Sequence, residues 1–599
     1  MEDNNIILKE VLNDCKEKYT KVRKLLDEDF KNDPRSAPYI SKYKAKSILR
    51  EIRETLVSKT GDVVIDAMLG VVLLQIGIIE MDTEELSNGE RILTEADSLL
   101  SNHSLHPTVI ITLLNVYNNL GVLWCNRDVP EKAKLYLLKA KDLYENFKCT
   151  LQMPITEEQL FGVAEDSNPD FVSLEKAYTL TLYYLAQFYC TIKLKLKSAL
   201  YYHITLKRQL EYEDYDPIEW ALNAATLSQI FVVENGFTQS RHHLAAASMI
   251  LDKYEEKLRQ SDTGDELFQS KLETFNHRSA DVALCWSKYC LILLSASKNR
   301  LMSDEIDSVI TDMFNITVEE GEIICESNLK NLVFDSFDLS AKENSVTDKF
   351  LLTFDDARKV FLVCQNWLNK AKEYYSLESL ASDYIQIVQN HSQALSNLAF
   401  FEDDEGRQAK MHKKRITLLE DLVKELNPTY YMQYCRQLWY ELGEIYTDLL
   451  NIKLERLEKS NMRPQPATLV KINCLCDKSV EKFELFLESV KDPKTGKMPA
   501  KLEPDVIRPV VSAYGFIGRN HMKKICAKDL QVLITTKSYE AYKAAVEICD
   551  NDPTAQEMMR EEISLCREMI SILPIKIRNL TSKCDNCMES LNFYITIIL

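Results

Sequence analysis

Apolar residues recur at helical spacing through most of this chain, and small residues interrupt them at fixed intervals. In the clearest copy, Gly121 and Ala133 lie twelve residues apart, and Ala133 and Ala140 lie seven apart. The large residues of the same copy are Tyr117, Leu120, Trp124 and Leu137. Two helices approach closely only where small side chains meet, and large side chains fill the space beside the crossing. The pattern predicts two packed helices, A and B, over residues 117–140.

Copies of this pattern recur, which is typical of tetratricopeptide repeats. The other N-terminal copies contain Leu73, Gly77, Gly89, Leu93 and Ala96; then Leu182, Leu185, Ala186 and Tyr189 with Ala199, Tyr202 and Leu206; then Leu227, Ser228 and Phe231 with Ser240, Leu244 and Ala247. The C-terminal copies contain Trp439, Leu442, Gly443 and Tyr446 with Ser479, Phe483 and Phe486; then Tyr514, Gly518 and His521 with Ser538, Tyr542 and Ala545. We predict an all-α fold, a right-handed tetratricopeptide-type helix-pair solenoid in two subdomains joined by a long helix. Such a solenoid is normally a curved surface that holds another protein.

The spacing of the copies divides the chain into four parts. We expect an N-terminal tetratricopeptide subdomain over 1–262 and a linker helix over 263–301. An acidic, partly disordered insertion should follow over 302–350, because residues 301–350 carry 12 acidic and 3 basic side chains. A C-terminal tetratricopeptide-like subdomain is expected over 351–599.

Composition supports a cytosolic helical protein. Glycine (14 residues) and proline (16) are scarce in 599 residues, which leaves few sites for tight β-turns. The net charge is −18 and no basic stripe is present, so we expect no nucleic-acid partner. The polar N-terminus is unlike a signal peptide, and we expect neither membrane insertion nor disulfides among the 16 cysteines. Acidity suits a partner with a basic face, although many cytosolic proteins are acidic.

No catalytic or metal-binding motif is found, so we expect no enzyme, no catalytic residue, no metal and no cofactor. The chain lacks a zinc-protease helix, a nucleophile elbow and a Rossmann glycine triplet. Cys584 and Cys587 form a lone C-x-x-C without two further ligands at matching spacing. His242 and His243 are interpreted as solvated surface plus one packed ring.

Helix A lines the concave groove of a tetratricopeptide array, and its polar residues are the candidate contacts. Positions two before or two after the crossing residues are occupied by Asn118, Tyr183, Gln187 and Gln229, and Tyr184 and Thr226 are their neighbours. Tyrosine, glutamine, asparagine and threonine suit a helical peptide or globular ligand that needs both hydrogen bonds and apolar contact. These residues could instead merely solubilise an open groove, and the tyrosines could be ordinary core.

Several longer motifs resemble the kinesin-binding protein family, also called the KIF-binding protein family. They are LYYLAQ at 182–187, TLKRQL at 205–210, PIEW at 217–220, NAATLSQ at 223–229, KMHKKR at 410–415 and DVIRP at 505–509. The resemblance extends over nearly the whole chain, and it adds Gln209 to the candidate partner-binding residues.

The resemblance implies a cytoplasmic, cytoskeleton-associated adaptor that binds kinesin motor domains and blocks their attachment to microtubules. It also implies roles in axon growth and in transport of organelles, including mitochondria. A general assembly scaffold or co-chaperone is the alternative, although a co-chaperone that clamps a carboxylate would need Lys and Arg on helix A. The sequence leaves the oligomeric state open.

Overall fold

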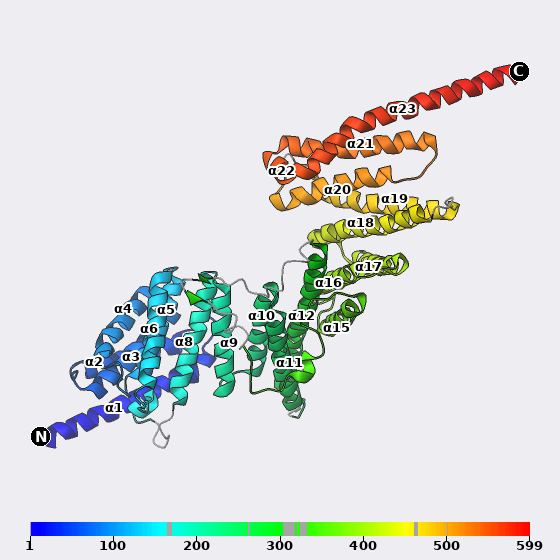
Figure 1. Ribbon diagram of the computed structural model, residues 1–599. Coiled ribbons are helices and arrows are strands. Elements are labelled where there is room, and N and C mark those ends of the chain that lie inside the picture. Colours follow the sequence, from blue (N-terminus) through cyan, green and yellow to red (C-terminus); the bar gives the residue numbers. More distant parts are fainter. Residues whose placement is uncertain are drawn as a thin grey trace. The chain divides into compact units, whose positions relative to one another are not determined.

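The computed structural model describes residues 2–163, 171–260, 264–303, 318–319, 322–323, 332–460, 465–499 and 501–598. Its helices follow one another in packed antiparallel pairs (Figure 1), which confirms the predicted all-α solenoid of helix pairs. One small departure is an antiparallel ladder of two-residue strands, β1 (Val318–Glu319) and β2 (Glu322–Ile323). The chain forms two compact units, Met1–Arg278 with Thr311–Asn344, and Ser279–Ile310 with Ser345–Leu599.

The first unit begins with α1 (Glu2–Asp27) and α2 (Ile40–Val57), and four helix pairs follow. The pairs are α3 (Val63–Asp82) with α4 (Leu86–Leu100), α5 (Ile110–Asn126) with α6 (Pro130–Lys148), α8 (Val172–Thr191) with α9 (Lys195–Glu211), and α10 (Pro217–Val233) with α11 (Phe237–Gln260). Short elements between or beside them are η1 (Asp29–Asn32), η2 (Ser101–His103), α7 (Glu157–Leu160) and α14 (Ser340–Glu343). These pairs occupy the positions that the repeat pattern predicts.

The boundary between the units falls inside α12 (Glu266–Met302), the helix predicted as a linker. The second unit continues with α15 (Phe354–Tyr374), α16 (Ala381–Phe400), α17 (Glu405–Glu425), α18 (Pro428–Lys459), α19 (Pro466–Val490), α20 (Pro504–Met522), α21 (Lys528–Asn551), α22 (Pro553–Met558) and α23 (Arg560–Ile598). Its strongest pairings join α18 to α19, α20 to α21, and α21 to α23.

Helix crossings lie at the predicted small residues. A Cβ added to Gly121 would lie 2.6 Å from Cδ2 of Leu137 on the partner helix. The same test at Gly443 and Gly518 meets the rings of Phe483 and Tyr542 at 2.8 and 2.7 Å. Glycine at these crossings therefore lets helix B rest its large side chain on the backbone of helix A.

Hydroxyl groups reinforce three of the crossings. Ser198 donates a hydrogen bond of 2.8 Å to the carbonyl of Ala186, and Ser538 donates one of the same length to Gly518. Ser479 donates likewise to the carbonyl of Gly443, again at 2.8 Å. A helix carbonyl accepts a second hydrogen bond through its other lone pair, so these serines satisfy their buried hydroxyls without breaking helix A.

The A-to-B turns of the first unit do not use glycine at their left-handed position. Each turn contains one residue with positive φ, and none of the four is glycine: Glu84 at 64°, Asp128 at 57°, Lys193 at 65° and Asn235 at 61°. A side chain in this left-handed conformation costs roughly 1 kcal/mol relative to glycine. The close packing of the flanking helices holds the turns in place against that cost.

Two described helices, α3 and α12, are long and apolar enough by composition to cross a membrane. In the structure, 67% of the most apolar stretch of α3 and 56% of that of α12 are buried inside the protein. Core helices of soluble proteins pass the same test, and the packing of α3 against α2, α4 and α5 accounts for its composition.

Part of the acidic region packs closely on the first unit, in what we call the 332–344 segment. The Phe334 ring is 2% exposed and lies among His203, Trp220 and His242, with ring centroids 4.8, 5.2 and 5.5 Å away. The Phe334 amide donates to Nε2 of His242 at 2.9 Å, and Nδ1 of His242 lies 2.7 Å from Glu343. The rest of the insertion predicted over 302–350 lies largely outside the described residues.

The His242–His243 pair is less solvated than the sequence interpretation held. His243 is completely buried, with Nδ1 2.7 Å from the Gln239 carbonyl and Nε2 3.0 Å from Nδ1 of His203. Burial, and then the neighbouring imidazole of His203, hold the pKa of His243 well below its usual range. Both ring nitrogens of His242 bond to the 332–344 segment, so neither His242 nor His243 is a solvated surface group.

Candidate partner-binding surface

Helix α8 presents two tyrosines and a glutamine at one side of a largely buried helix. Leu182, Leu185 and Ala186 lie in the core, whereas Gln187 is exposed and Tyr183 and Tyr184 are half-buried. Nε2 of Gln187 donates a 2.7 Å hydrogen bond to the hydroxyl of Tyr183, one turn earlier. Burial, and then the neighbouring Tyr183, raise the pKa of Tyr184. The arrangement offers aromatic edges and amide groups to a partner, with no charge.

The Tyr183 ring is held in place by its neighbours. It lies 5.9 Å from the Tyr184 ring and 6.1 Å from the Tyr202 ring of α9, the latter edge-on. Aromatic pairs prefer such tilted and edge-to-face arrangements, which limit ring motion. A partner would therefore meet a tyrosine whose position is already fixed, which reduces the entropy lost on binding.

Helix α10 carries the second part of the surface. It begins cleanly because Asp216 accepts hydrogen bonds of 2.9 Å from the amides of Ile218 and Glu219, and Pro217 occupies the first turn. Thr226 is exposed, and Gln229, one turn later on the same face, is half-buried and donates to the hydroxyl of Ser228 at 2.9 Å. The two residues form a short polar strip.

The structure places the other two candidates differently. Gln209 lies half-buried on α9, a B helix. Asn118 is completely buried on α5 and donates a 3.3 Å hydrogen bond to the carbonyl of Ala177 on α8. Asn118 therefore links neighbouring repeats, and we leave it out of the proposed surface. The remaining set, which we call the α8–α10 surface, consists of Tyr183, Tyr184, Gln187, Gln209, Thr226 and Gln229.

A buried ionic cluster fixes α8 against its neighbours on both sides. Glu175 is 1% exposed and lies 2.6 Å from Lys148, 2.6 Å from the Tyr144 hydroxyl and 2.5 Å from Arg208. Burial by itself would raise the pKa of Glu175, but the hydrogen bonds from these three groups outweigh it and lower that pKa. The carboxylate is therefore charged and joins α6, α8 and α9.

Sequence reasoning missed this cluster and the 332–344 segment. The rings of Tyr144 and Tyr178 stack 3.6 Å apart, and the Arg208 guanidinium lies 4.9 Å from the Tyr178 ring. The sequence does not reveal that Glu175 and Arg208 lie in contact, because they belong to different helices. The segment had a detectable signal, because Leu332, Phe334 and Leu339 are apolar residues within an otherwise acidic region, and all three are buried.

The described residues offer no metal site to set beside this surface. No group of three or more His, Cys, Asp or Glu side chains among them is arranged to hold a metal ion. Cys584 and Cys587 lie on α23 in a part whose side chains fall outside the described set. The chemistry of the α8–α10 surface is that of hydrogen bonding and aromatic contact, which suits recognition of another macromolecule.

Comparison with known proteins decides the family. A family model described as KIF-1 binding protein C terminal matches residues 218–580. Curated KIF-binding proteins align with nearly the whole chain: that of Drosophila melanogaster is 34% identical over 597 residues, 96% of this chain and 98% of the relative. The chain belongs to the KIF-binding protein family.

Other members of the KIF-binding protein family match to a similar extent. The protein of Gallus gallus is 37% identical over 588 residues, 95% of this chain and 97% of the relative. The solved structure of the KIFBP core is 32% identical, covers 45% of this chain and 87% of that chain, and superposes with a TM-score of 0.31. The family model and the curated relatives confirm the resemblance stated from the sequence motifs.

Proposed function

We propose that this chain binds kinesin motor domains through the α8–α10 surface and blocks their attachment to microtubules. The observation that carries the proposal is family membership, since relatives that align with nearly the whole chain bear the name KIF-binding protein. The exposed Gln187 and Thr226 and the fixed Tyr183 supply the hydrogen bonds and aromatic contacts that such recognition uses.

Charge supplies the second support. The chain carries a net charge of −18, and a motor docks on the acidic microtubule through a basic face. An acidic protein that covers this face competes directly with the microtubule. Charge complementarity accelerates association and acts over roughly 8 Å at physiological salt. The motor's association rate should therefore fall as salt rises, while its dissociation rate changes less.

The same proposal places the protein in the cytoplasm, associated with the cytoskeleton, as a regulator of microtubule-based transport and axon growth. It assigns no catalysis and no cofactor to the chain. The proposed mechanism requires only that a motor domain cannot bind this protein and a microtubule at the same time.

The test replaces Gln187, Gln209 and Thr226 together with alanine. Binding of a panel of kinesin motor domains is then measured by surface plasmon resonance. Each side chain is exposed or half-buried, so the fold should persist while affinity falls at least tenfold. The matched control replaces Asn88, Thr94 and Ser98, three exposed polar residues of α4, with alanine. Equal motor affinity for the two triple variants would show that the α8–α10 surface is the wrong site.

A further inference from the structure

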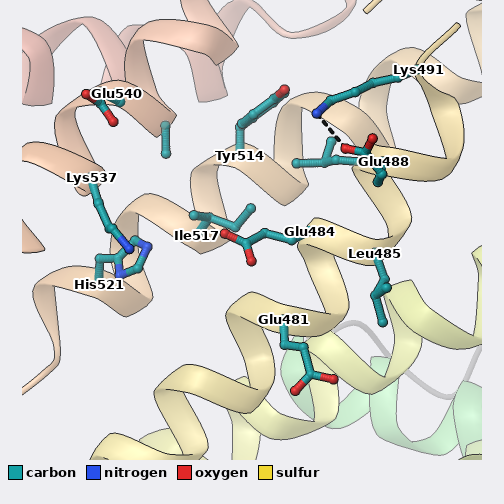
Figure 2. Close-up of a pocket in the computed structure, with 12 residues that line it drawn as sticks. Glu481, Glu484, Leu485, Glu488, Lys491, Tyr514, Ile517, His521, Lys537 and Glu540 are labelled. Atoms are coloured by element: carbon teal, nitrogen blue, oxygen red, sulfur yellow. Dashed lines mark hydrogen bonds and ion pairs between the residues drawn. The ribbon is translucent and has the colours of Figure 1, made fainter. Parts of the chain in front are cut away.

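The second unit has a groove of about 630 Å³ between α19 and α21, and glutamate side chains line it (Figure 2). Glu488 pairs with Lys491 at 2.6 Å, and Glu481 lies 3.1 Å from Lys482. Carboxylates that are partly neutralised by lysines do not specify a ligand. The first unit contains a more informative site, because a segment of the chain itself already fills it.

The Phe334 side chain of the 332–344 segment fills a pocket on the first unit. Four aromatic rings form the pocket: His203 of α9, Trp220 of α10, and His242 and His243 of α11. Their centroids lie 4.8, 5.2, 5.5 and 5.1 Å, in that order, from the centroid of the Phe334 ring. We call this site the Phe334 pocket.

Hydrogen bonds hold three walls of the Phe334 pocket without any contribution from the 332–344 segment. Nε1 of Trp220 donates to the carbonyl of Leu206 at 3.0 Å. Nδ1 of His243 lies 2.7 Å from the Gln239 carbonyl, and Nε2 of the same ring lies 3.0 Å from Nδ1 of His203. The pocket should therefore keep its shape when the segment leaves. A preformed pocket also reduces the ordering cost that a ligand meets on binding.

His242 is the wall that depends on the 332–344 segment. Its Nε2 accepts a 2.9 Å hydrogen bond from the Phe334 amide, and its Nδ1 lies 2.7 Å from a carboxylate oxygen of Glu343. When the segment leaves, both ring nitrogens lose these partners, and an N–H group and an acceptor must replace them. A peptide with an acidic side chain supplies both groups.

Two lysines beside the pocket favour a particular sequence. Lys207 of α9 pairs with Asp335 at 2.6 Å, and Nζ of Lys253 on α11 lies 4.8 Å from the centroid of the Phe337 ring. Cations attract carboxylates and the negative faces of aromatic rings. Ser336, between these two contacts, is exposed. The surface therefore suits the sequence Phe-Asp-x-Phe, in which the third position is unrestricted.

The 332–344 segment is held less firmly than the helices of the solenoid. Leu332, Phe334 and Leu339 are its fully buried side chains. Its ion pairs to Lys207 and Asp252 lie at the surface, where such pairs contribute little to stability. Segments with few buried apolar side chains open more readily than the core around them. A competing peptide can therefore gain access to the pocket.

We propose that the Phe334 pocket binds a partner protein, which inserts a segment with the sequence Phe-Asp-x-Phe and displaces the 332–344 segment. The partner's first phenylalanine replaces Phe334, its aspartate pairs with Lys207, and its second phenylalanine lies beside Lys253. The 332–344 segment acts as a competitor within the chain, because only the fraction of molecules with an open pocket can bind the partner.

The first test uses full-length chains and a fluorescein-labelled peptide with the core Phe-Asp-Ser-Phe-Asp-Leu between glycine–serine flanks. Fluorescence anisotropy measures binding. Phe334→Ala empties the pocket, so this variant should bind the peptide at least tenfold more tightly than the unmodified chain. Val333→Ala, at an exposed neighbouring position, should bind it as the unmodified chain does. A peptide with alanine in place of its first phenylalanine should bind the Phe334→Ala chain at least tenfold more weakly.

An exchange of charges locates the peptide. Lys207→Glu, introduced into the Phe334→Ala chain, should weaken binding by up to about fivefold, because the ion pair is exposed. A peptide with lysine in place of its first aspartate should recover this loss on the Lys207→Glu chain. Lys195→Glu is the matched control, an equal change in net charge at an exposed position of α9. It should neither weaken the first peptide nor favour the second.

A second measurement follows displacement in the unmodified chain, and it decides the matter even if Phe334→Ala fails to fold. A large excess of the peptide should accelerate amide hydrogen exchange in residues 332–344, and the peptide without its first phenylalanine should not. Motor binding plays no part in these measurements, so their result is independent of the proposed function.

Four outcomes would overturn the proposal. The Phe334→Ala chain could bind the peptide no more tightly than the unmodified chain, or the peptide without its first phenylalanine could bind equally well. Excess peptide could leave the exchange of residues 332–344 unchanged. Analytical ultracentrifugation could show a dimer of the unmodified chain that Phe334→Ala converts to a monomer. In that case two copies of this chain exchange their 332–344 segments, and the pocket's ligand is not another protein.

Discussion

Replacement of Gly121 by alanine tests the helix register that defines the repeats. The added methyl would lie 2.6 Å from Cδ2 and 2.7 Å from Cγ of Leu137, and Leu137 is completely buried. Overpacking of this kind costs about 1–3 kcal/mol. Alanine also gains about 1 kcal/mol over glycine inside a helix. We therefore expect Gly121→Ala to lower the free energy of unfolding by about 1 kcal/mol.

A double-mutant cycle isolates the contact. Leu137→Ala alone should cost about 2–5 kcal/mol, because it leaves a cavity at the crossing. In the double variant, the methyl of Ala at position 121 occupies part of that cavity and meets no Leu137 side chain. The double variant should therefore be more stable than the sum of the single changes predicts, by about 1–3 kcal/mol.

The assay is urea unfolding followed by circular dichroism, with hydrogen exchange to locate the change on α5 and α6. Gly515→Ala on α20 is the matched control, since a Cβ there meets no atom within 4 Å. It should stabilise the chain by about 0.5–1 kcal/mol. Additive effects of Gly121→Ala and Leu137→Ala would refute the close crossing, and so would stabilisation by Gly121→Ala equal to that of Gly515→Ala.

Three further predictions concern other parts of the fold. Burial, and then nearby Lys414 and Lys372, lower the pKa of His391 to about 4, whereas its value in the unfolded chain is about 6.5. The neutral, buried His391 therefore makes its full contribution to folding stability above about pH 6.5. That contribution is lost as the pH falls toward 4. His391→Leu should remove that part of the pH dependence in thermal melts, and an unchanged slope would contradict this. Phe334→Ala should accelerate hydrogen exchange throughout the 332–344 segment, while Val333→Ala, at an exposed position, should not. Lys193→Gly should raise the free energy of unfolding by up to about 1 kcal/mol, because it relieves a positive φ; destabilisation would show that the Lys193 side chain matters more than the backbone.

The sequence predicts the helix pairs well because a crossing restricts side-chain size at fixed spacing. Gly121, Gly443 and Gly518 each lie against a large residue of the partner helix, as their spacing predicts. The turns between these helices were less predictable. Packing of the flanking helices holds Glu84 and Lys193 at positive φ, and their residue types alone do not indicate that conformation.

The candidate surface was predicted only in part. Gln187 and Thr226 are exposed, but Asn118 occupies a similar position in its repeat and is completely buried. The difference arises because α8 packs directly on α5 and covers that position, which depends on how neighbouring repeats stack rather than on the repeat pattern. The negative charge of the 332–344 segment likewise led to a prediction of partial disorder. The buried Phe334, which anchors the segment, was not identified from the sequence.

The most direct test of the proposed function is co-sedimentation of a kinesin motor domain, microtubules and this protein together. With the motor locked on microtubules by a non-hydrolysable nucleotide, rising concentrations of the protein should move the motor from the pellet to the supernatant. The protein itself should stay in the supernatant with it. If the protein instead pellets with motor-decorated microtubules and leaves the bound motor fraction unchanged, the exclusion mechanism is wrong.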